Sequence, residues 1–319
     1  MNLASTGEVA RCLFSSNSTA IWRGPSQGGA IRHTRPLVIN QSAFLNNSAR
    51  GGDGWDSGNH TFPAGPGQGG AISSQATLNA TNCIFVGNSV ASGVGAAVEP
   101  GQGGAIATAS GSQVQLTHCS FSSNSIILDP RFPSTEPPSG SAIWLWPFTT
   151  NSKLTLQASA IANSPLFPAI NPAFINDAGF NICSDSTAFL NQPTSLNNTD
   201  PLLEFVPTAN FAILRPKLGS PAIDLVSTHL ADYDIRGALR PQTGSDSGAV
   251  ELEAALPLSF SISTKKFILS LQSYSEPLRL FATDDFKTWT DLGLVNPANQ
   301  PLTFPANSTR QFFRLQLDP

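Results

Sequence analysis

The chain has 319 residues, a formal net charge of −4 and only 12% charged residues, about half the usual share. The first lysine is Lys153 and the arginines of the first half stand singly, so no basic stripe could neutralise phosphates and nucleic acid is excluded as a partner. No run of about 18 apolar residues occurs, which excludes a helical membrane span.

The composition favours an all-β chain. It contains 26 glycines and 25 prolines, which punctuate turns and interrupt helices. The opening stretch MNLASTGEVARCLFSSN lacks the segments of a signal peptide and enters a repeat directly, so we expect the chain to be part of a longer architecture. The four cysteines have no metal-binding spacing, and the sequence therefore predicts no metal site of that kind.

Two short signatures alternate along residues 1–165. The first is the hexapeptide SQGGAI or GQGGAI, at Ser26–Ile31, Gly67–Ile72 and Gly101–Ile106, with a shorter copy, SGSAI, at Ser139–Ile143. The second has a small residue or Cys, then Phe two positions later and Asn at the end, at Cys12–Asn17, Ser42–Asn47, Cys83–Asn88 and Cys119–Asn124. Such a repeat predicts a stack of similar coils.

Short alternating runs such as Ala76–Asn82 and Ser112–His118 lie between the signatures and predict half-buried strands. No helix or hairpin dipeptide returns the chain on itself, so we expect a coil whose equivalent positions lie above one another. The expected ladders are Phe14, Phe44, Phe85 and Phe121; Ile31, Ile72, Ile106 and Ile143; and Asn17, Asn47, Asn88 and Asn124. The paired glycines would turn a corner where a Cβ atom would clash.

These repeats resemble those of right-handed parallel β-helix proteins, including the polymorphic outer-membrane adhesins of chlamydiae and large secreted bacterial proteins. Five later segments resemble the choice-of-anchor Q region that closes many bacterial β-helix proteins. They are GFNICSDST (Gly179–Thr187), NTDPLL (Asn198–Leu203), LGSPAID (Leu218–Asp224), DIRGALRP (Asp234–Pro241) and DSGAVE (Asp246–Glu251). The resemblance implies a secreted or cell-surface protein. The sequence departs from the pattern at Leu225 and Val226.

The last part of the chain predicts a separate module. Residues from about Leu256 onward contain short alternating runs separated by turn residues, enough for a small antiparallel β-sandwich. The sequence thus predicts an all-β chain with a right-handed parallel β-helix over residues 1–254, made of repeats (1–165) and a closing region (166–254). The sandwich would occupy residues 255–319.

The variable segments between one Phe/Asn signature and the next hexapeptide are candidates for ligand binding. They should emerge side by side on one edge of the helix, because they occupy the same place in successive coils. The candidate ligand-binding residues are Asp53, Trp55, Asp56, His60, Arg131 and Glu136. In the longest segment, carboxylates could hold calcium and an indole could stack on a sugar; the alternative is a solvated loop with Asx turns.

Six charged residues crowd into the closing region of a chain otherwise poor in charge. They are Asp224, Asp234, Arg236, Arg240, Asp246 and Glu251. Buried charges need partners, so we interpret them as a structural network of ion pairs and hydrogen bonds that seals the end of the helix.

The sequence leaves two classes of function open. The first is a secreted or cell-surface bacterial protein, monomeric, with a structural or adhesive role and a polysaccharide or host-cell glycan as its ligand. The alternative is a polysaccharide lyase or glycoside hydrolase, since parallel β-helices serve both roles. The repeat region places no two acidic residues on one repeat strand, so no catalytic residue is assigned and the non-enzymatic class is favoured.

Overall fold

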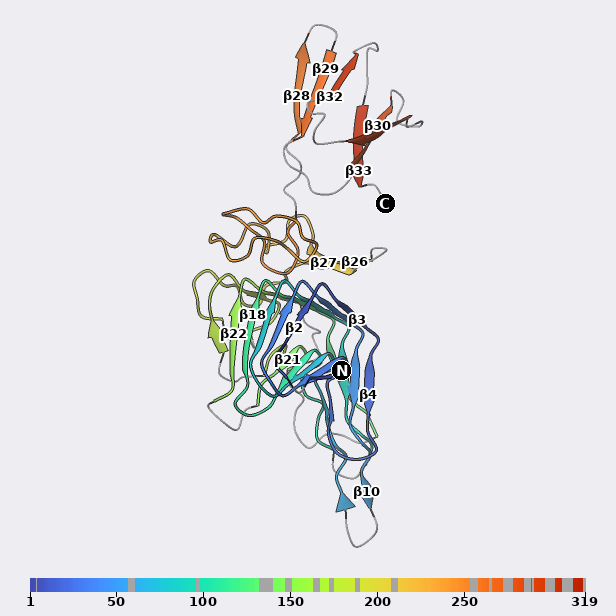
Figure 1. The fold of residues 1–319 in the computed structure, drawn as a ribbon, viewed down its shortest axis with the longest axis vertical. Coiled ribbons are helices and arrows are strands. Elements are labelled where there is room, and N and C mark those ends of the chain that lie inside the picture. Colours follow the sequence, from blue (N-terminus) through green and yellow to red (C-terminus); the bar gives the residue numbers. More distant parts are fainter. Residues whose placement is uncertain are drawn as a thin grey trace. The chain divides into compact units, whose positions relative to one another are not determined.

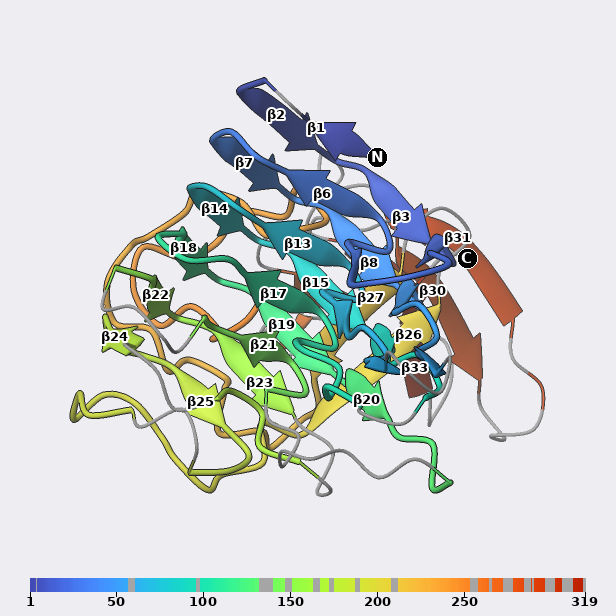
Figure 2. The ribbon, with the colours of Figure 1, turned by 90° about the horizontal axis from the view of Figure 1, so that it is seen from below.

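The computed structural model describes residues 1–3, 5–56, 61–95, 98–131, 140–146, 151–162, 167–171, 175–186, 190–207, 212–252, 258–263, 266–271, 278–283, 288, 290–295, 302–305 and 312–317. The chain divides into two compact units, Met1–Leu252 and Glu253–Pro319. All regular elements in the described ranges are β-strands. The first unit is a parallel β-helix, as predicted (Figures 1 and 2).

In the described residues, four parallel sheets form the walls of the helix, and a coil adds at most one short strand to each of them. Figure 2 shows β2, β7, β14, β18 and β22 following one another along the stack. The isoleucine sheet contains β1 (Asn2–Leu3), β6 (Ile31–His33), β13 (Ile72–Ser74), β17 (Ile106–Thr108) and β21 (Ile143–Trp144). The leucine sheet contains β2 (Gly7–Ala10), β7 (Leu37–Asn40), β14 (Leu78–Thr81), β18 (Gln113–Thr117), β22 (Lys153–Gln157) and β24 (Ile175–Asp177).

The other two walls follow in each coil. The phenylalanine sheet contains β3 (Leu13–Ser15), β8 (Ala43–Leu45), β15 (Ile84–Val86), β19 (Ser120–Ser122), β23 (Ala160–Ala162) and β25 (Ile182–Cys183). The serine sheet contains β4 (Ser18–Ala20), β9 (Ser48–Arg50), β16 (Ser89–Ala91) and β20 (Ser125–Ile127). Three smaller pairs complete the unit: β5 (Ser26–Gln27) with β12 (Gly67–Gln68), β10 (Trp55–Asp56) with β11 (Thr61–Phe62), and β26 (Leu203–Pro207) with β27 (Ala212–Pro216).

The three predicted ladders are confirmed. Successive phenylalanine rings from Phe14 to Phe121 stack with centroids 4.7–4.9 Å apart and planes within 7° of parallel. The isoleucines pair in register from Ile31 to Ile143. In the asparagine ladder, Asn47 Nδ2 donates to Asn88 Oδ1 at 2.9 Å, and the pattern continues to Asn124. Each coil therefore buries its apolar positions against the coils on either side.

The glycine pair of the hexapeptide permits a close approach between two parts of the coil. Gly69 has a φ of +67°, which few residues other than glycine adopt. A Cβ atom on Gly70 would lie 2.5 Å from the carbonyl oxygen of Ser89 and 2.1 Å from that of Gly104. The corner therefore lies too close to the serine sheet and to the next coil for a side chain, which explains why the glycines recur in each copy of the hexapeptide.

A second corner joins the leucine and phenylalanine sheets and has in each coil a residue other than glycine in the left-handed conformation. The corner residues are Arg11, Gln41, Asn82, His118, Ala158 and Phe180, with φ between +48° and +59°. The side chains of Gln41 and Asn82 and the carbonyl groups of Ala158 and Phe180 lie on the outside of the coil, where the later segment of residues 233–248 contacts them.

The described residues of the second unit form six strands in two three-stranded antiparallel sheets. One has β28 (Leu258–Ser263), β29 (Lys266–Leu271) and β32 (Leu302–Pro305), and the other has β30 (Leu278–Thr283), β31 (Thr290–Val295) and β33 (Phe312–Leu317). This is the small antiparallel module that the alternating sequence predicts.

Candidate functional site

The variable loops that follow β4, β9 and β16 lie against one another on one edge of the helix. The amide of Gly52 donates to the carbonyl of Gly24 at 2.9 Å, and the amide of Gly65 donates to the carbonyl of Gly52 at the same distance. The amide of Gly93 in turn donates to the carbonyl of Gly65 at 3.0 Å. The expectation that these segments emerge side by side is confirmed for three loops.

The hairpin of β10 and β11 carries two aromatic residues at this edge. It projects beyond the stacked coils (Figure 1). Trp55 lies directly opposite Phe62, and the ring centroids are 6.0 Å apart with planes 16° from parallel. Trp55 is 52% exposed and Phe62 45% exposed, so the ring pair is half accessible to solvent.

The preceding loop, which contains Trp22 and Arg23, places Arg23 beside this pair. The guanidinium carbon of Arg23 lies 5.7 Å from the ring centroid of Trp55 and equally far from that of Phe62. Gly52 has no Cβ, and one placed there would lie 2.5 Å from the Cα atom of Arg23. Trp22 is 86% exposed. We call Trp22, Arg23, Trp55 and Phe62 the aromatic edge.

Asp53 links its own loop, which follows β9, to the loop that follows β16. Its Oδ1 accepts a hydrogen bond from the amide of Val94 at 2.8 Å and pairs with Arg50. The pKa of Asp53 is lowered, first because of the Val94 amide and then because of Arg50, against the opposing effect of burial. Asp56 pairs through its backbone with Thr61, and its side chain lies outside the described residues.

The remaining candidates do not join the aromatic edge in the described structure. Arg131 forms a local pair with Asp129, with 2.6 Å between Nη2 and Oδ2, and this pair lowers the pKa of Asp129 to about 2. His60 and Glu136 lie outside the described residues. Arg23 was not singled out from the sequence, although its place directly after Trp22 in a variable loop is a usable signal.

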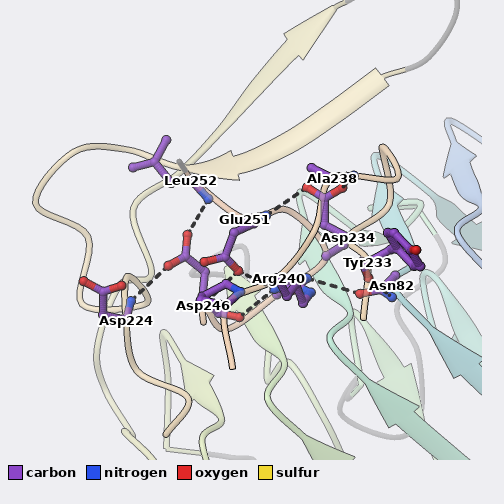
Figure 3. Close-up of polar contacts among 12 residues, drawn as sticks. Asn82, Asp224, Tyr233, Asp234, Ala238, Arg240, Asp246, Glu251 and Leu252 are labelled. Carbon is purple, nitrogen blue, oxygen red and sulfur yellow. Dashed lines mark hydrogen bonds and ion pairs between the residues drawn. The ribbon is translucent and has the colours of Figure 1, made fainter. Parts of the chain in front are cut away.

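The charged residues of the closing region do lie together, as Figure 3 shows. The Arg240 side chain is 1% exposed and its Nη1 is 2.8 Å from Glu251 Oε2. Arg236 pairs with Asp234 at 2.8 Å, and Asp246 accepts the amide of Asp224 at 2.9 Å. Burial raises the pKa of Glu251 to about 7 and that of Asp246 to about 6.

The location of this network corrects the expectation that it seals the end of the helix. The closing segment (residues 218–252) instead runs along the outer surface of several coils. Four contacts follow the corner residues: Gln41 Nε2 to the carbonyl of Asp234, Asn82 Nδ2 to that of Tyr233, the Gly248 amide to the carbonyl of Ala158, and Ser247 Oγ to that of Phe180. Side chains that point outward from the phenylalanine sheet therefore become a second core, which includes Ala43, Ile84 and Val250.

His118 lies beneath this segment without good hydrogen bonds. Neither ring nitrogen has a partner within hydrogen-bonding geometry. Burial, followed by the nearby charge of Arg240, lowers the pKa of His118 to about 3, although the backbone of Gly248 and Asp246 acts in the opposite direction. The ring is therefore neutral at physiological pH.

The carboxylate that closes the last coil is Asp177, which no motif of the sequence singles out. It is paired in register with Leu156, an apolar core position of the preceding coil. Its Oδ2 accepts the amides of Asn191 and Gln192 at 2.8 and 2.7 Å, and its Oδ1 accepts the hydroxyl of Ser195 at 2.9 Å. The segment around residues 190–195 is thereby held over the end of the leucine sheet.

Comparison with family models, with curated proteins and with solved structures finds no match for this chain. Within the described ranges, no group of three or more His, Cys, Asp or Glu side chains could hold a metal ion. The part of the chain that the structure describes has no helix with the length and apolar character of a membrane span.

Proposed function

We propose that this chain is a secreted or surface-displayed bacterial β-helix protein that binds carbohydrate through its aromatic edge and acts in adhesion. The observation that carries the proposal is the pair of half-exposed rings of Trp55 and Phe62 on a hairpin. Exposed aromatic faces stack on the apolar faces of sugar rings, and loops held by a rigid scaffold are common binding sites.

The stack of coils supplies the rigidity that such a site requires. The loops of the aromatic edge are bonded backbone to backbone across coils, and Asp53 links two of them through its carboxylate. The rings are thus presented with little conformational entropy left to lose on binding. We assign a bacterial cell surface, a glycan partner and a monomeric state to this proposal, consistent with the likeness to the choice-of-anchor Q region.

The test is a binding measurement with the full chain on a panel of immobilised polysaccharides. Trp55→Ala should weaken binding to the recognised glycan by about tenfold or more, which corresponds to about 1.4 kcal/mol. Tyr233→Ala is the matched control, because Tyr233 is also about half exposed, at 49%, but lies in the closing segment.

Two results would contradict the proposal: no binding to any glycan of the panel, or equal affinity of the wild-type protein and Trp55→Ala. Release of unsaturated products or new reducing ends would instead indicate the lyase or hydrolase class.

A further inference from the structure

Arg23 is the cation of the aromatic edge, and no carboxylate of the described residues forms an ion pair with it. Within the described residues, the carboxylate of the adjoining loop, Asp53, is engaged by another arginine, Arg50. Arg23 is exposed, so a ligand can reach it.

The position of Arg23 fits it for recognition of an acid group next to a stacked sugar. Its guanidinium carbon is equidistant, at 5.7 Å, from the Trp55 and Phe62 ring centroids. A guanidinium has five N–H donors in a fixed plane. Contact with aromatic rings does not occupy these donors, whereas hydrogen bonds to carboxylate oxygens would. The rings hold the cation in place and leave donors that match a carboxylate or sulfate in two-point geometry.

We propose that the aromatic edge selects glycans whose sugar rings carry a carboxylate or a sulfate, with Arg23 as the residue that confers the selection. The inference rests on the proposed carbohydrate function and adds the chemical class of the ligand. A sugar ring would stack on Trp22 or Trp55, and its acid group would take the donors of Arg23. Charge-assisted hydrogen bonds are about twice as strong as neutral ones, so the acidic sugar should be strongly preferred.

The test compares matched ligands on the full-length protein. Polygalacturonate oligomers and their fully methyl-esterified forms share one backbone and differ in charge, and dextran sulfate against dextran makes the same comparison for sulfate. Titration calorimetry at constant ionic strength should show that the wild-type protein binds the acidic member of at least one pair about tenfold more tightly. The pair that shows the preference identifies the acid group.

Three variants assign the preference to Arg23. Arg23→Gln should reduce the acidic-to-neutral affinity ratio to below about twofold while neutral binding persists, and Arg23→Lys should keep only part of it, because a lysine lacks the planar pair of donors. Arg35→Gln is the matched control: it removes the same charge from another exposed arginine of the first coils and should leave the ratio unchanged.

The outcomes separate this inference from the proposed function. Equal affinity of the wild-type protein for acidic and neutral members of both pairs overturns the selection by Arg23 but leaves glycan binding intact. A preference that survives in Arg23→Gln, or that falls equally in Arg35→Gln, overturns it as well. Failure to bind any of the four probes and any panel glycan overturns the proposed function and this inference with it.

Discussion

At the scale of single residues, His118 is a histidine whose ring is buried and therefore stays neutral. It occupies a left-handed corner with a φ of +49°. Its side chain is fully buried, and neither ring nitrogen has a hydrogen-bond partner. The equivalent residue of the preceding coil, Asn82, has a φ of +52°. Asn82 gains bonds to Tyr233 and Arg240 at that position.

Burial of a neutral histidine makes stability depend on pH. The pKa of His118 is lowered to about 3 in the folded chain, whereas an unfolded histidine titrates near 6.5. Between these values the unfolded chain binds the extra proton, so the contribution of His118 to stability is present above about pH 6.5 and is lost as the pH falls. At pH 5 the loss should be about 2 kcal/mol, at 1.36 kcal/mol per unit.

His118→Asn should remove this dependence, because asparagine tolerates the left-handed corner and does not titrate. Denaturant unfolding of both proteins at pH 7 and pH 5 should show the wild type losing about 2 kcal/mol more than the variant over that interval. Asp246 and Glu251 titrate in both proteins and so cancel in the comparison. Parallel changes in the two proteins would contradict the buried neutral state.

At the scale of elements, the glycines of the hexapeptide let the corner of a coil lie close to the serine strand of the same coil and to the corner of the next coil. The predicted reason, a corner where a Cβ atom would clash, is confirmed, and the obstacles are the backbone of the next coil's hexapeptide, at the carbonyl of Gly104, and the backbone of the serine sheet at Ser89. On Gly70, a Cβ atom would lie within 2.6 Å of both the amide nitrogen and the carbonyl oxygen of Ser89. These are backbone atoms, and they cannot rotate away as the end of a side chain could.

Gly70→Ala should therefore destabilise the helix by about 3 kcal/mol or more, at or above the upper end of the overpacking range. Gly7→Ala is the control, because the nearest atom to an added Cβ there is Leu37 Cδ1 at an ordinary 3.7 Å, and it should change stability by less than about 0.5 kcal/mol. Thermal and denaturant unfolding measure both. Similar stabilities of the two variants would mean that the coil can widen at this corner.

Contacts that recur in every coil can be predicted from the sequence, whereas contacts that occur only once cannot. The positions of Phe85 and Asn88 are occupied by the same residue types in neighbouring coils, so spacing alone predicts their ladders. The closing segment docks through single contacts over long separations, such as Gln41 with Asp234 across 193 residues, and such contacts leave no periodic trace. The contacts of Arg23 at the aromatic edge also occur only once. Asp177 places a carboxylate at a core position, and only the structure shows the amides of Asn191 and Gln192 that bind it.

At the scale of the whole molecule, the closing segment belongs to the helix although it follows the last coil. It covers the outer surface of the phenylalanine sheet, where Ile84 and Val250 share one apolar cluster. It also encloses Arg240, whose charge is balanced by Glu251. The amide of Leu252 is held by Asp246 Oδ2 at 2.6 Å, so the first unit ends on a bonded residue.

A chain that ends after Leu252 should consequently keep the stability and glycan binding of the first unit, whereas a chain that ends only nine residues earlier, after Thr243, should not. The shorter chain lacks Glu251 and Asp246, leaves Arg240 without its buried partner and exposes part of the phenylalanine sheet. Loss of one partner of a buried pair costs about 3–5 kcal/mol, before the lost apolar contacts are added. Denaturant midpoints and resistance to trypsin would distinguish the two chains. Equal stability of both would show that the closing segment does not stabilise the helix, and failure of the longer chain to fold would show that residues 253–319 are needed by the first unit.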